Sequence, residues 1–196
     1  MTLRDITRNK AVFIILLSLL LTLRCPIQSR ANELIITIDV SRQKLFLFEN
    51  VPFENPKLIK MYPVSTSKYG VGNENSSMKT PLGTHFIAEK IGDGTKIGTI
   101  FELCENTGGI AEIYTDAKDI EEDLITTRIL WLRGIVPGVN EGEGVDSYNR
   151  HIYIHGSPEE GLIGTPVSNG CIRMKNKDII ELFDSISEGT LVGIHE

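Results

Sequence analysis

The sequence predicts a mainly β fold with one or two short helices packed on the sheets. Short apolar runs rich in β-branched residues recur along the chain, and turn-forming residues separate them. One helical pattern stands near the C-terminus, between Asn176 and Gly189. The sequence contains no internal repeat or low-complexity tract, and 196 residues suffice for one domain with a sizeable core.

The first 31 residues have the composition of a secretory signal peptide. Three basic residues stand before position 11, and the run 11–23 is almost purely apolar. Such a run is too short to cross a bilayer, which takes about 20 residues, but it suits the core of a signal peptide. Ser29 and Ala31 are the small residues that a signal peptidase recognises, so we expect cleavage before Asn32. An uncleaved N-terminal anchor is the alternative.

Export would leave one mature domain over residues 32–196, in the periplasm or cell envelope. Residues 1–31 hold five basic side chains and one acidic side chain, so the net charge of −6 becomes −10 in the mature domain. This acidic balance does not favour nucleic acid as a partner, because nucleic acid is bound by clustered Lys and Arg.

The region after the leader begins with a predicted β-hairpin. Residues 34–38 and 44–48 are apolar and rich in β-branched or aromatic side chains, and 39–43 between them supplies turn residues. Residues 58–64 predict a third strand, and residues 85–88 predict another.

The middle of the chain predicts loops around one compact strand. Residues 65–79 are polar and Gly-rich, and 91–109 is broken by glycines. Residues 115–123 are compatible with either a short acidic helix or a loop. Residues 129–132 predict an apolar strand, and 137–144 predicts a Pro- and Gly-rich loop that either borders a functional site or simply connects two elements.

The C-terminal part predicts a strand, a helix and a last strand. Residues 150–154 form the first strand, which leads into a histidine. Asn176 or Asp178 is expected to cap the helix through its side chain. The helix ends before Gly189, and residues 191–194 predict the last strand.

The stretch from His155 to Arg173, HGSPEEGLIGTPVSNGCIR, holds the residues that indicate chemistry. Cysteine is the most nucleophilic side chain, and a neighbouring imidazole can take its proton, so we expect Cys171 as nucleophile and His155 as base. A thiolate–imidazolium pair would populate the reactive thiolate near neutral pH. Gly170 permits positive φ, and backbone N–H groups at such a turn can point at a developing oxyanion.

His155 and Gly156, followed by SNGCIRM at 168–174, resemble the signature of the L,D-transpeptidase family, also called the YkuD domain. The predicted hairpin and the TPLG run at 80–83 also resemble this domain, so the resemblance covers nearly all of the chain after the leader. It implies a β-sandwich-like catalytic domain that acts on peptidoglycan stem peptides through a cysteine, with no metal or other cofactor. It also implies that the carbonyl of Gly156 orients the base.

The resemblance implies a thioester on Cys171, formed from a donor tetrapeptide and passed to an amine acceptor as an L,D cross-link. Water as the acceptor would make the enzyme an L,D-carboxypeptidase, and a lipoprotein lysine as the acceptor would anchor that protein to the wall. A catalytically silent wall-binding domain is a further alternative. Asn169 is the one motif feature that favours it, because the family often has His or another basic residue there.

Four neighbours of the nucleophile have expected roles. Asn169 and Gly170 belong to the oxyanion turn, and Ser168 donates a hydrogen bond within this turn or to the substrate. Arg173 shares a face with Cys171 if the segment is extended, and a guanidinium binds a carboxylate bidentately, so substrate binding is expected. A structural ion pair of Arg173 is the alternative.

Two further residues compete for the catalytic roles. His151 lies four positions before His155 on the predicted strand, so the two would share a face, and His151 is the second choice of base. Cys104 is the other cysteine of the mature domain, and two cysteines in an oxidising compartment often pair. A Cys104–Cys171 disulfide would abolish the thiolate. No Cys and His cluster has the spacing of a zinc site.

Overall fold

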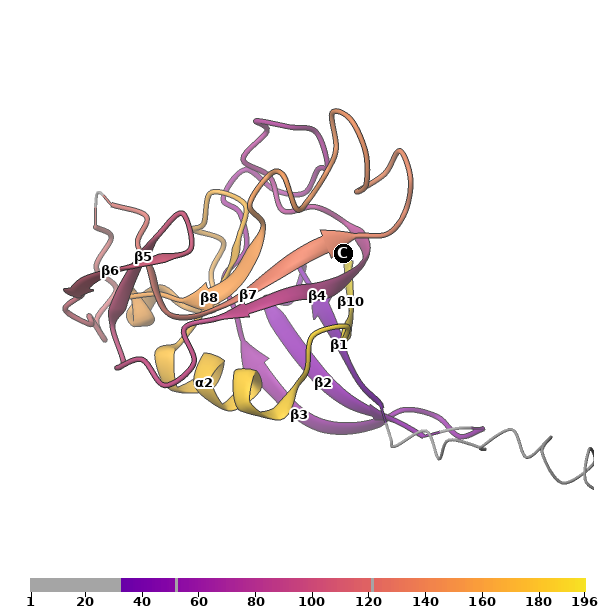
Figure 1. Ribbon diagram of the computed structural model, residues 1–196, viewed down its shortest axis with the longest axis horizontal. Coiled ribbons are helices and arrows are strands. Elements are labelled where there is room, and N and C mark those ends of the chain that lie inside the picture. The colour runs from indigo at the N-terminus through magenta and orange to yellow at the C-terminus, as the bar shows by residue number, and fades with distance from the viewer. Residues whose placement is uncertain (1–32, 52, 121) are drawn as a thin grey trace, which may run out of the picture. The chain divides into compact units, whose positions relative to one another are not determined.

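The computed structural model describes residues 33–51, 53–120 and 122–196, and the expected leader over 1–31 lies outside them. The described residues form one ten-stranded sheet, one α-helix and one 3₁₀ helix, so the mainly β prediction is confirmed (Figure 1). In this part of the chain, no helix has both the length and the apolar character needed to cross a membrane.

The sheet is built from ten short strands, most of them antiparallel. Along the chain these are β1 (Glu33–Asp39), β2 (Lys44–Asn50), β3 (Lys57–Pro63), β4 (Gly83–Ile91), β5 (Thr99–Glu102), β6 (Glu105–Ile110), β7 (Ile125–Gly134), β8 (Tyr153–Gly156), β9 (Ile172–Met174) and β10 (Leu191–His195). The order across the sheet is β3-β2-β1-β10-β4-β7-β5-β6, and β8 pairs with β7 and with β9. The pairs β1–β10 and β8–β9 are parallel.

The N-terminal hairpin forms as its two apolar runs and the turn residues between them predict. Ile36 and Ile38 on β1 are buried, as are Leu45 and Leu47 on β2, because alternate residues of a strand share one face. The expected third strand forms as β3, and the expected strands at 85–88 and 129–132 form as the longer β4 and β7. These strands supply much of the main apolar core.

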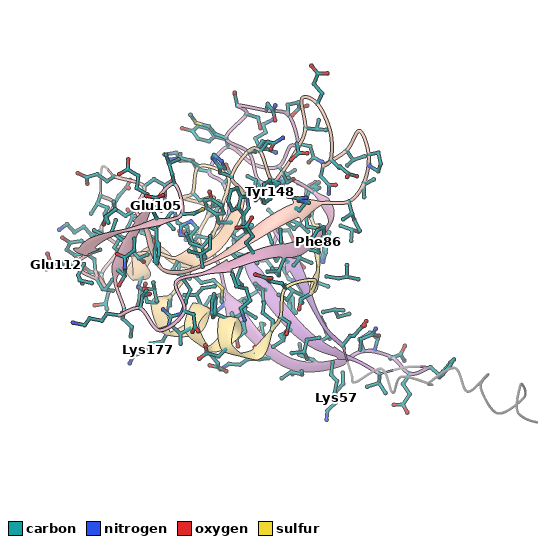
Figure 2. All side chains as sticks on the ribbon, in the orientation of Figure 1. Lys57, Phe86, Glu105, Glu112, Tyr148 and Lys177 are labelled. Carbon is teal, nitrogen blue, oxygen red and sulfur yellow. The ribbon has the colours of Figure 1, made fainter. Side chains whose placement is uncertain are left out.

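The helix α2 (Asn176–Ser185) packs on β7 and β8, the strands nearest the candidate site (Figure 1). Ile179, Leu182 and Phe183 are buried at helical spacing and join the main core. The exposed side chain of Lys177 points away from the sheet (Figure 2). The capping prediction is wrong: Lys175 occupies the N-cap position without a side-chain hydrogen bond, and Asn176 is the first, buried residue of the helix.

A hairpin of β5 and β6 occupies part of the region that its glycines marked as a loop. Its two turn residues, Leu103 and Cys104, both have positive φ, at 47° and 68°. Turns of this kind usually carry Asn-Gly or Asp-Gly. Because Leu-Cys gives no such signal, the sequence did not indicate the hairpin.

The strand expected over 150–154 begins only at Tyr153. Arg150 and His151 lie in a turn in which the N–H of His151 donates to the carbonyl of Tyr148 at 3.0 Å, and His151 has a φ of 56°. The expectation that His151 and His155 share a strand face is therefore wrong. Of the two alternatives for 115–123, the described residues form a loop.

We expect Leu182→Ala to lower the free energy of unfolding by roughly 2–5 kcal/mol, because it leaves a cavity between α2 and the sheet. Lys177→Ala on the exposed side of the same helix should change it by less than about 0.5 kcal/mol. Urea unfolding of both variants measures the difference. Equal, small effects would contradict the packing of α2.

Candidate active site

The parallel pairing of β8 with β9 brings the two halves of the HG…SNGCIRM motif together. The register sets His155 beside Arg173, and Cys171 directly precedes β9. The backbone N–H of Tyr153 donates to Cys171 Sγ at 3.4 Å, and the thiol donates to the carbonyl of His151 at 3.4 Å. The sulfur is thus held at the strand that carries His155, although the two residues lie 16 positions apart in the sequence.

His155 is buried and has one defined hydrogen bond. Its Nδ1 lies 2.8 Å from the carbonyl oxygen of Gly156. A carbonyl only accepts, so Nδ1 carries the proton of the neutral ring and Nε2 keeps its lone pair. This tautomer is the one that a general base requires.

Burial opposes charge on both members of the pair. Loss of solvent lowers the pKa of His155, while Asp123 and the Gly156 carbonyl act to raise it. Loss of solvent raises the pKa of Cys171, which Asp123 raises further, whereas the Tyr153 N–H, Arg173 and Arg150 lower it. Burial thus favours the neutral forms, a thiol and a neutral imidazole, over the thiolate–imidazolium pair expected from the sequence.

The turn before Cys171 is closed by Ser168. The Ser168 hydroxyl donates to the carbonyl of Cys171 at 2.6 Å and accepts from the Gly170 N–H at 3.2 Å. Gly170 has a φ of 128°, which L-residues with a side chain rarely adopt. Asn169 is exposed, and its amide donates to Asp123 Oδ2 at 2.9 Å.

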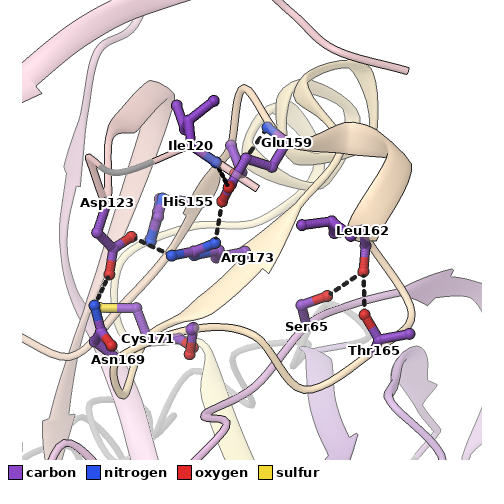
Figure 3. Close-up of polar contacts among 12 residues, drawn as sticks. Ser65, Ile120, Asp123, His155, Glu159, Leu162, Thr165, Asn169, Cys171 and Arg173 are labelled. Atoms are coloured by element: carbon purple, nitrogen blue, oxygen red, sulfur yellow. Dashed lines mark hydrogen bonds and ion pairs between the residues drawn. The ribbon is translucent and has the colours of Figure 1, made fainter. Parts of the chain in front are cut away.

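The buried side chain of Arg173 pairs with the buried Glu159 and with the more exposed Asp123 (Figure 3). Its Nη2 is 2.6 Å from Asp123 Oδ1, and its Nη1 pairs with Glu159. Glu159 also accepts from the backbone N–H of Ile120 at 2.8 Å. The structure thus contains the ion pair that was the alternative to substrate binding by Arg173.

Three residues that the sequence analysis did not assign to the site complete it: Asp123, Glu159 and Asn176, the last of which was expected only as a helix cap. Asp123 bridges Arg173 and Asn169, so it ties the loop before β7 to the catalytic turn. No local pattern marked it, since its partners lie about 50 positions away. A carboxylate in a polar loop is usually solvated, so only the fold identifies this one.

Asn176 explains why residue 156 is glycine. Its Oδ1 accepts from the hydroxyls of Thr126 and Thr127, and its Nδ2 donates to the Ser157 carbonyl at 2.8 Å. A Cβ on Gly156 would lie 2.6 Å from Asn176 Oδ1 and 2.7 Å from the Thr126 carbonyl oxygen. Only glycine leaves room for Asn176 of α2 and Thr126 of β7 to approach the backbone directly after His155 so closely.

The competing residues take other positions. His151 is exposed, and its ring packs edge-on against Trp131 with 5.4 Å between centroids; its carbonyl contacts the Cys171 thiol. Cys104 donates to Tyr153 Oη at 3.3 Å. Cys104 and Cys171 are both free thiols, so the structure does not contain the alternative disulfide.

A mainly β domain in which a half-buried cysteine, directly before β9, lies at the strand that carries a buried histidine is the class that the fold and the site define. The sequence profile of the L,D-transpeptidase catalytic domain, YkuD, matches residues 33–194, which is most of the chain. The chain therefore belongs to the YkuD family of L,D-transpeptidase catalytic domains.

Two curated relatives come from Bacillus subtilis (strain 168). The chain is 50% identical over 46 residues to the candidate L,D-transpeptidase YkuD, covering 24% of this chain and 28% of the relative. It is 51% identical over 39 residues to the candidate L,D-transpeptidase YqjB, covering 20% of this chain and 22% of the relative. The matches thus span 28% or less of the length of these relatives.

Solved structures share the fold at low sequence identity. Bd1075 of Bdellovibrio bacteriovorus aligns with a TM-score of 0.55 and 20% identity, covering 86% of this chain and 50% of that one. L,D-transpeptidase 3 of Mycobacterium tuberculosis, solved with a faropenem-derived adduct, aligns with a TM-score of 0.51 and 15% identity. The alignment covers 85% of this chain and 61% of that one. At these identities the likeness concerns the fold alone.

We expect Gly156→Ala to lower the free energy of unfolding by roughly 1–3 kcal/mol, because the added methyl overpacks against Asn176 and β7. Gly193→Ala is the matched control, since a Cβ at Gly193 in β10 meets no atom within 4 Å. Thermal or urea unfolding measures both. Equal stability of the two variants would contradict the close approach at Gly156.

We expect the alkylation rate of Cys171 by iodoacetamide to keep rising with pH above about 8.5, where an unperturbed thiol titrates. The raised pKa of Cys171 places its thiolate at higher pH. Peptide mass analysis between pH 6 and 10 separates Cys171 from Cys104. A plateau below pH 8 would instead indicate a thiolate already formed at rest.

Proposed function

We propose that this chain is a cysteine L,D-transpeptidase of peptidoglycan stem peptides. The observation that carries the proposal is the orientation of His155. Its Nδ1 is occupied by the Gly156 carbonyl, which leaves Nε2 as the basic nitrogen at the strand pair that holds Cys171. A nucleophile whose base is oriented by a third group is the usual arrangement for covalent acyl transfer.

The first half of the reaction forms a thioester. His155 takes the proton of Cys171 as the sulfur attacks the carbonyl of the third residue of a donor tetrapeptide. The Gly170 N–H is engaged by Ser168, so the Cys171 N–H is the first donor for the oxyanion. The imidazolium then protonates the amine of the terminal residue, which leaves.

The carboxylate of Asp123 supports this proton transfer without contacting the substrate. It favours the protonated form of His155, so it stabilises the imidazolium that exists only during the reaction. Arg173 and Asn169 hold this carboxylate in one orientation. In this proposal Arg173 acts as a positioning residue, and the catalytic residues are Cys171 and His155.

The second half of the reaction decides the product. An amine of a second stem peptide gives an L,D cross-link, and a lipoprotein lysine would give protein attachment to the wall. Water would give an L,D-carboxypeptidase. All three pathways share the thioester on Cys171, whereas a silent wall-binding domain would not form it.

The proposed reaction takes place outside the cytoplasm. The composition of residues 1–31 supports export of the domain to the periplasm or cell envelope, by a cleaved signal peptide or an N-terminal anchor. Peptidoglycan lies in that compartment.

We expect intact-mass analysis of the full chain to show one covalent adduct after exposure to a carbapenem, and none with Cys171→Ala. The Mycobacterium tuberculosis relative with a faropenem-derived adduct motivates the choice of reagent. Incubation with a donor tetrapeptide, with and without an amine acceptor, then separates cross-linking from hydrolysis. A folded, reduced chain that forms neither adduct nor product would favour the wall-binding alternative.

A further inference from the structure

A pocket of about 360 Å³ lies beside the catalytic turn. This volume is in the range of small-ligand sites. Its lining is mainly polar, and the residues that matter here are Asn75, Met78, Asn149, Arg150, Ile152 and Asn169. None of them belongs to the Asp123–Arg173–Glu159 cluster.

Gly170 lies between this pocket and the nucleophile. A Cβ at Gly170 would be 3.5 Å from Ile152 Cδ1 and 3.6 Å from the Met78 carbonyl oxygen, and both residues line the pocket. Asn169 lines it directly, two positions before Cys171. A ligand in the pocket is therefore adjacent to the turn that presents the sulfur.

Arg150 is a half-buried cation with no carboxylate partner among the described residues. Its Nη1 donates to the carbonyls of Gly72 and Asn73 at 3.2 and 3.0 Å, and its Nη2 donates to the carbonyl of Lys79 at 2.6 Å. Arg173, by contrast, has two carboxylates. Neutral oxygens, three carbonyls and the Ser77 hydroxyl, fix the Arg150 guanidinium, and the Glu74 carboxylate acts on it without forming an ion pair. Because no carboxylate is in direct contact with this cation among the described residues, its charge can attract an anion.

We propose that this pocket binds a carboxylate of the donor peptide, with Arg150 supplying the charge and the amides of Asn149 and Asn75 supplying further polar contacts. The proposal rests on the function proposed above and adds a specificity determinant to it. Arg150 also acts to lower the pKa of Cys171, which agrees with its position near the sulfur. The carboxylate is either the terminal one of the leaving residue or a side-chain carboxylate of the stem.

Asn149→Asp tests the pocket without removing a structural contact. Among the described residues the Asn149 side chain has no hydrogen-bond partner, whereas its backbone N–H donates to Asp146. The substitution adds one negative charge beside Arg150. In the Cys171→Ala chain, which prevents turnover, we expect it to raise the Kd for a donor tetrapeptide roughly tenfold by like-charge repulsion. Isothermal titration calorimetry measures this Kd.

Asn50→Asp is the matched control, because it makes the same charge change at the exposed end of β2, outside the pocket, and should leave the Kd unchanged. Asn75→Asp provides a second charge within the pocket and should act like Asn149→Asp. Donor peptides amidated either at the C-terminus or at the side-chain carboxylate show which of the two carboxylates binds in the pocket. The increase in Kd caused by Asn149→Asp should disappear for the peptide that lacks the bound carboxylate.

An unchanged Kd in both pocket variants, or a penalty that persists with every amidated peptide, would overturn the pocket assignment. So would the absence of measurable binding to the Cys171→Ala chain. Turnover by the chain with Cys171 intact is measured in parallel. If the chain with Cys171 shows no turnover while Asn149→Asp still raises the Kd, the transpeptidase proposal is contradicted and the pocket assignment is retained.

Discussion

The buried guanidinium of Arg173 is the constraint on which the rest of the site depends. It lies on β9, two residues after the nucleophile, and pairs with Glu159 from the segment after β8 and with Asp123 from the loop before β7. Asp123 in turn holds Asn169 in the catalytic turn. The Arg173–Glu159 pair is buried on both sides, and removing one partner of such a pair leaves an uncompensated charge and costs about 3–5 kcal/mol. The loop, the turn and both strands of the motif are therefore held by one cation.

The same burial that makes this cluster rigid favours the neutral forms of His155 and Cys171. Desolvation acts against the imidazolium of His155 and against the thiolate of Cys171. Charge appears on both groups only when the proton moves. Asp123 stabilises the positive charge of the His155 imidazolium and destabilises the negative charge of the Cys171 thiolate. The negative charge of the thiolate must therefore be stabilised by groups other than Asp123.

The fold was largely predictable, whereas the shell around the catalytic pair was not. Apolar runs bounded by turn residues predicted β1, β2 and β3, and the helical pattern after Asn176 predicted α2, because these patterns are local. The β5–β6 hairpin was missed because its Leu103-Cys104 turn carries none of the usual turn residues. His151 was assigned to a strand face because no local signal marks its positive φ. Asp123 and Asn176 act through partners distant in sequence, which no single-sequence pattern records.

The charges around Cys171 are arranged asymmetrically, and this asymmetry matches the proton transfer. On the His155 side, two carboxylates surround one guanidinium, so the cluster of Asp123, Glu159 and Arg173 is net negative. On the pocket side, the hydrogen-bond acceptors of Arg150 are neutral, namely three carbonyls and the Ser77 hydroxyl. Moving a proton from Cys171 to His155 places positive charge toward the first group and negative charge toward the second. Such a preorganised field favours the charge-separated state in the direction that acylation requires. A donor carboxylate bound at Arg150 would neutralise that cation and raise the pKa of the thiol again. Arg150 would therefore increase affinity for the donor at some cost in thiolate stabilisation, and Arg173 would remain as the other cation that lowers the pKa of Cys171.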